Sequence, residues 1–121
     1  MTIETLIEKI QAEKPNAFSD DKLLEFVNEI ESDVAEQVNV ECPVYTIEDD
    51  MTRELLVPAP YDRLYVSYLK AMVDYTNEEY ASYQLNQEQH AQDFSDFLDW
   101  AVRTRQISEP RSPRRFRHIF G

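Results

Sequence analysis

Apolar residues recur along most of this chain at intervals of three and four, the spacing that places them on one face of an α-helix. Four segments show this pattern, and they predict helices over residues 2–12, 20–39, 61–75 and 77–105. Ser19 is a good N-cap for the second helix. Thr76 and Glu79 match a capping box, which predicts the break before the fourth helix. We expect Tyr80 and Tyr83 on the buried face of that helix.

Residues 40–60 lack the helical pattern, and Pro43, Pro58 and Pro60 exclude a continuous helix there. Residues 44–47 and 55–57 are β-prone, and they either pair as a short hairpin or pack as extended chain. The only glycine is Gly121, whereas a sheet-rich fold needs many turns. The sequence therefore predicts an all-α fold: a small four-helix bundle with an irregular 40–60 segment and an extended C-terminal arm.

Charge reverses close to the end of the fourth predicted helix. Residues 1–102 carry 6 basic and 23 acidic residues, and residues 103–121 carry 6 basic and 1 acidic, for a net charge of −12. Pro110 and Pro113 exclude helix in the basic part. We therefore divide the chain into a bundle domain, residues 1–105, and a basic arm, residues 106–121.

Within the arm, arginines alternate with apolar side chains. A disordered basic end and a nucleic-acid-binding arm both fit this composition. We favour a peptide that docks on a partner protein by β-augmentation, since apolar anchors would be wasted in solvent. The expected docking residues are Arg111, Arg114, Arg115, Phe116, Arg117, Ile119 and Phe120.

The residues needed for catalysis do not occur together. Cys42 is the only cysteine and is distant in sequence from His90 and His118, so no nucleophile–base pair is apparent. His90 and Asp93 could share a helix face, but without a second histidine we interpret His90 as a surface residue. A chain with one glycine has no Gly-rich phosphate loop. We expect no enzyme activity, no metal and no cofactor.

Residues 55–65, Leu-Leu-Val-Pro-Ala-Pro-Tyr-Asp-Arg-Leu-Tyr, and residues 68–75, Tyr-Leu-Lys-Ala-Met-Val-Asp-Tyr, resemble a known segment. It occurs in head–tail connector (adaptor) proteins of long-tailed double-stranded DNA bacteriophages. Leu23, Leu24, residues 29–31, Glu79, Tyr80, residues 83–86 and Phe94 are also similar. The resemblance covers roughly residues 20–105 and leaves out the basic arm.

The resemblance implies an all-helical structural protein of the virion neck, assembled in the host cytoplasm. Such proteins are not enzymes, and they carry no cofactor. They form a ring, commonly of twelve copies, between the portal protein and a tail-proximal neck or stopper protein. Genomic DNA passes through the lumen without specific binding, and an acidic wall would repel its phosphates. We expect the arm to dock on the portal, and no membrane contact.

A ring places one face of each copy against a different face of the next. Because the chain is acidic, its few basic residues are the natural complement, and tyrosines are enriched at interfaces. Seven tyrosines occur, six of them in residues 61–83. The expected subunit-interface residues are Arg53, Tyr61, Arg63, Tyr65 and Lys70. The alternative function is a free-standing acidic helical regulator or DNA mimic, which the basic arm fits less well.

Overall fold

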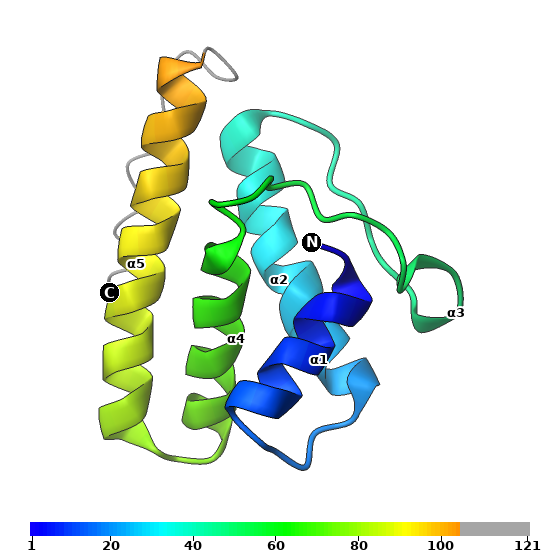
Figure 1. Cartoon of the computed structure of the whole chain (residues 1–121), viewed down its shortest axis with the longest axis vertical. Helices are drawn as coiled ribbons and strands as arrows, with labels where there is room; N and C mark the ends of the chain where they lie inside the picture. The colour runs from blue at the N-terminus through cyan, green and yellow to red at the C-terminus, as the bar shows by residue number, and fades with distance from the viewer. Residues whose placement is uncertain (105–121) are drawn as a thin grey trace.

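A computed structural model describes residues 1–104. They form five helices, with no β-strand in that range: α1 (Ile3–Glu13), α2 (Asp20–Val38), α3 (Ile47–Asp50), α4 (Arg63–Thr76) and α5 (Tyr80–Arg103) (Figure 1). The all-α prediction is confirmed, and the four long helices lie close to the predicted ranges. The one-turn helix α3 lies in the irregular 40–60 segment and was not predicted.

The caps explain most of these boundaries. Ser19 accepts a hydrogen bond from the Lys22 N–H, as the sequence predicted. Asn39 ends α2 in the left-handed conformation, with φ of 60°. The predicted break after α4 is present, but its capping box is absent. The Thr76 hydroxyl donates instead to the Met72 carbonyl within α4.

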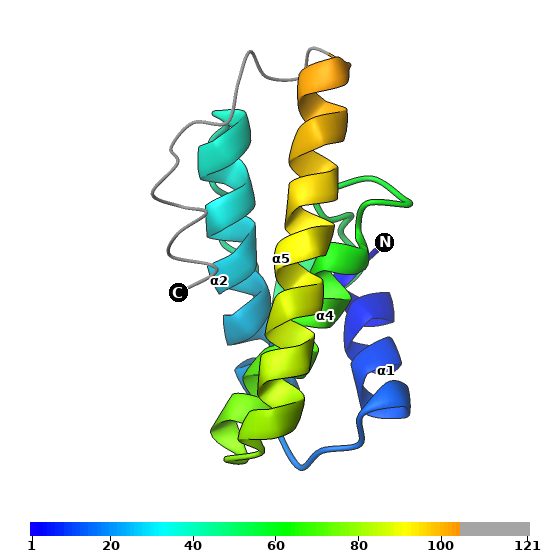
Figure 2. The same ribbon diagram turned by 90° about the vertical axis from the view of Figure 1, so that its left-hand side faces the viewer.

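The helices α4 and α5 form an antiparallel hairpin and lie side by side in Figure 1, whereas α5 lies in front of α4 in the turned view (Figure 2). Helices α1 and α2 pack against α4, and their apolar faces meet in one core. Tyr80 and Tyr83 do not reach this core, contrary to the prediction. They pack against Tyr75 across the α4–α5 turn, with ring centroids 6.2 and 5.1 Å apart.

The segment between α2 and α4 forms no hairpin. Its backbone pairs instead with the start of α1, where the Leu55 N–H donates to the Met1 carbonyl and the Ile3 N–H to the Arg53 carbonyl. Thr2 and Glu54 form an isolated antiparallel bridge. Of the two alternatives left open by the sequence, the structure adopts extended chain packed against the bundle (Figure 1).

A buried carboxyl group fixes this segment to the bundle. Glu31 of α2 is fully buried and accepts hydrogen bonds from the Tyr65 hydroxyl at 2.5 Å, the Tyr45 hydroxyl at 2.6 Å and the Leu56 N–H at 3.0 Å. The Tyr65 hydroxyl in turn accepts from the Val57 N–H. Burial and the adjacent Glu31 raise the pKa of both tyrosines, so each keeps the proton it donates.

This network can be tested with Tyr65→Phe. The change leaves Glu31 and the Val57 N–H short of a partner in the core, so we expect unfolding free energy to fall by about 1–3 kcal/mol. Urea denaturation measures the loss. Tyr68→Phe is the matched control, because the Tyr68 hydroxyl bonds to Glu29 at an exposed site. Equal losses in the two variants would contradict the role given to Glu31.

Candidate functional site

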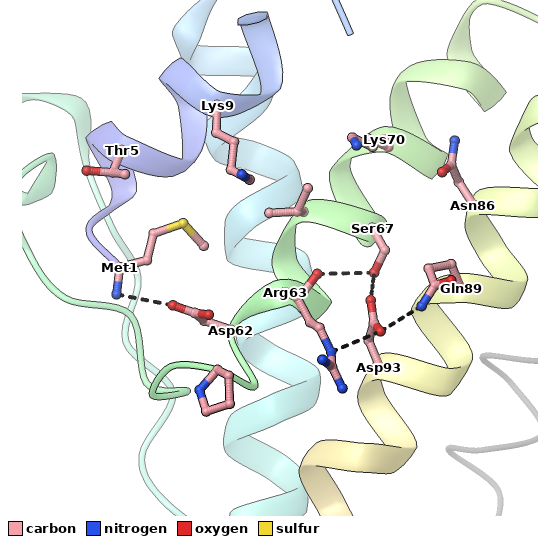
Figure 3. Close-up of a pocket in the computed structure, with 12 residues that line it drawn as sticks. Met1, Thr5, Lys9, Asp62, Arg63, Ser67, Lys70, Asn86, Gln89 and Asp93 are labelled. Atoms are coloured by element: carbon pink, nitrogen blue, oxygen red, sulfur yellow. Dashed lines mark hydrogen bonds and ion pairs between the residues drawn. The ribbon is translucent and has the colours of Figure 1, made fainter. Parts of the chain in front are cut away.

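A groove of about 600 Å³ opens between α1, α4 and α5 (Figure 3). Lys9 of α1 and Arg63 and Lys70 of α4 line it, together with the amino group of Met1. The apolar side chain of Val66 and the carboxylates of Asp62 and Asp93 also line it. An otherwise acidic chain thus gathers several of its cations around one concave surface.

Carboxylates of the same chain hold two of these cations in place. The Glu13 carboxylate pairs with Lys70 Nζ and with Lys9 Nζ, each at 2.7 Å. Hydrogen bonds from Lys70 and then Lys9 lower the pKa of Glu13 to about 2. Glu13 therefore joins α1 to α4 along one edge of the groove, and the two ammonium groups keep part of their surface toward solvent.

Arg63 spans from α4 to α5. Its Nη2 lies 2.9 Å from Asp96 Oδ2, and its Nε lies 3.3 Å from Asp93 Oδ1. Asp93 is buried and also accepts hydrogen bonds from Ser67 and Gln89, both at 2.9 Å. The guanidinium side chain is still 51% exposed, so it is oriented by its own chain yet accessible to a partner.

The structure separates the five predicted interface residues. Arg63 and Lys70 line the groove together. Tyr61 stacks on Trp100, with ring centroids 5.2 Å apart, and Arg53 lies over the ring of Tyr45. Tyr65 is 0% exposed and bonds to Glu31, so its prediction as an interface residue is wrong. The predicted docking residues of the arm lie outside the described part of the chain.

Sequence reasoning missed a second buried carboxylate next to the groove. Asp74 of α4 lies 2.7 Å from Lys14 Nζ and accepts hydrogen bonds from Ser82 and Asn86 of α5, both at 2.7 Å. Burial favours a higher pKa for Asp74, but these donors outweigh it and hold the pKa below its usual value. The only sequence signal is an acid directly after the apolar Val73.

His90 is buried, so its interpretation as a surface residue is wrong. Its Nδ1 lies 3.0 Å from the Leu64 carbonyl, which assigns the ring proton to Nδ1. Tyr68 and Phe94 pack against the ring edge-on. Burial lowers the pKa of His90 to about 4, against smaller opposing effects of the Leu64 carbonyl and Asp93.

Asp93, one turn along the helix from His90, is engaged by Arg63, Ser67 and Gln89. Within residues 1–104 no three histidine, cysteine or acidic side chains cluster as metal ligands. No helix in the same range is both long and apolar enough to cross a bilayer.

Comparison with known proteins gives no match: no family model, no curated protein and no solved structure is similar to this chain.

The buried His90 predicts a specific loss of stability in acid. Its pKa in the folded state, about 4, is below the ordinary 6.5, so the unfolded chain binds the proton more tightly. The contribution of neutral His90 to the free energy of unfolding is fully present above pH 6.5 and is lost as the pH falls towards 4. For a pKa shift of this size the loss is about 3 kcal/mol.

The measurement is the difference in unfolding free energy between the wild type and His90→Gln as a function of pH. Taking this difference cancels the contribution of the carboxylates, because they titrate in both proteins. The wild type should lose stability relative to the variant as the pH falls through this window. A difference independent of pH would show that His90 titrates normally.

Proposed function

We propose that this protein is a structural subunit of a phage neck, in which copies assemble into a ring between portal and tail. The observation that carries the proposal concerns the residues of the family resemblance. Glu31 and Tyr65, far apart in the sequence, bond to each other at 2.5 Å in the core. Asp74 and Asn86 also belong to it and bond at 2.7 Å. Both members of each pair lie in the part of the chain that carries the resemblance, and this supports the proposal of a shared fold.

The distribution of charge fits a ring through which DNA passes. No basic residue occurs between Lys22 and Arg53, a stretch that includes nearly all of α2 and all of α3. Exposed carboxylates such as Glu25 and Glu29 lie on α2. A lumen lined by such residues repels phosphates, so a genome can slide through without sticking.

The groove supplies a surface for contact between subunits. A closed ring uses heterologous contacts, in which two different faces meet. The groove of one copy, with Arg63 and Lys70 at its surface, is complementary to an acidic face of the next. We propose twelve copies, the number implied by the resemblance, bound to the portal and to a tail-proximal stopper.

The mass of the purified protein, alone and with a portal, tests this function most directly. A neck subunit gives a ring-sized complex on the portal. A free-standing acidic regulator, the alternative function, stays small and ignores the portal.

Arg63→Glu should weaken assembly at least about ten-fold, because it places a carboxylate in the groove where an acidic neighbour docks. Sedimentation of the portal complex measures the effect. Lys22→Glu is the matched control, since Lys22 is exposed on α2, contacts only Glu25 and the Phe26 ring among the ion pairs and ring contacts of residues 1–104, and does not line the groove. Circular dichroism checks folding, because the new carboxylate lies next to Asp93 and Asp96. Intact necks and normal infectivity in particles carrying Arg63→Glu would exclude Arg63 from the interface.

Deleting residues 106–121 should leave the helicity of the bundle intact and abolish portal binding, if the arm anchors the ring through arginine–carboxylate pairs and apolar pockets. Binding of the shortened and full chains to immobilised portal gives the comparison. Unchanged affinity would place the anchor elsewhere. Steeply salt-dependent binding of the full chain to duplex DNA, without portal binding, would instead favour the nucleic-acid interpretation of the arm.

A further inference from the structure

A second, apolar groove of about 320 Å³ lies between the C-terminal ends of α2 and α5. It is lined entirely by apolar residues: Val34, Val38, Val40, Leu56, Pro58, Phe97 and Trp100. Val40 is 48% exposed and Leu56 is 40% exposed, so part of this apolar surface faces solvent. Apolar surface gathered in a concavity marks a place where another apolar group binds.

The described part of the chain ends close to this groove. Trp100 lines it, and α5 ends at Arg103, less than one turn later. The following residues include Phe116, which a fully extended chain would place at most about 40 Å from Thr104. A segment on so short a tether has an effective concentration in the millimolar range at the groove, so weak contacts suffice to hold it.

The charge around the groove is complementary to that of the segment that follows α5. The segment 105–121 is basic, whereas no basic residue occurs between Lys22 and Arg53, the stretch that forms one wall of the groove. Glu41 directly follows Val40, and Asp99 directly precedes Trp100; both carboxylates are exposed. Arginines beside apolar anchors would meet carboxylates beside an apolar groove.

We propose that this groove binds the chain's own C-terminal segment, with Phe116, Ile119 and Phe120 filling it and the neighbouring arginines pairing with the acidic rim. The contact forms within one copy and requires no portal, so it does not rest on the proposed function. In a neck protein it would add regulation: the side chains that dock on the portal are covered until the portal competes for them.

Trp100 is the only tryptophan and lines the groove, so its fluorescence reports occupancy in the full chain. Replacing the three anchors together (F116A, I119A, F120A) should shift its emission to the red. Quenching by acrylamide should rise roughly two-fold, since the ring loses its covering side chains. A synthetic peptide of residues 105–121, added to this variant, should reverse both changes with saturation.

Val40→Asp should produce the same red shift in the full chain. Combined with the anchor substitutions, it should weaken peptide binding at least about ten-fold, because a carboxylate replaces apolar surface in the groove. Val44→Asp is the matched control: Val44 is in the same loop and 75% exposed, but it does not line the groove. Its spectrum and its peptide affinity, measured in the same anchor-substituted chain, should be unchanged.

Three results would overturn the proposal. The first is a wild-type spectrum in the anchor variant. The second is an equal effect of the Val40 and Val44 substitutions. The third is emission that changes over about a hundred-fold range of protein concentration, because a contact within one chain does not depend on concentration.

Discussion

The arrangement of this protein depends on one buried carboxyl group. Burying Glu31 without partners would cost several kcal/mol, so donors must converge on it. Tyr65 comes from α4, while Tyr45 and Leu56 come from the two ends of the irregular segment. A segment that contains only the one-turn helix α3 is thereby fixed across the bundle. The Val57 N–H, which donates to Tyr65, adds a further tie on the same segment.

Donors also converge on two further buried carboxylates, which lie near the charged groove. Asp74 and Asp93 are buried carboxylates, and each is satisfied by a cation and by hydroxyl or amide donors. Those donors join α4 to α5, and Glu13 adds α1 through Lys70. Cations are thus committed to the face where three helices meet, and α2 is left strongly acidic. Each of these cations is paired with a carboxylate of the same chain, so the groove is a network of ion pairs that joins α1, α4 and α5.

The exposed apolar surface lies away from the charged groove, where the loop after α2 meets the last turns of α5. Val40 and Leu56 are exposed there because the bundle offers no further helix to cover them. The charged groove and the apolar groove therefore suit different occupants. We propose an acidic neighbour for the first and a basic segment with apolar anchors for the second.

The sequence alone determined the four long helices, because apolar spacing, proline positions and the scarcity of glycine are local properties. It also singled out Arg63 and Lys70, which line one groove. It could not decide which polar side chains are buried, since this depends on partners distant in the chain. Tyr65 was expected at an interface and His90 at the surface, yet Glu31 and the Leu64 carbonyl hold both inside. Only tertiary packing supplies such partners, and only it places cations from α1 and α4 around one groove.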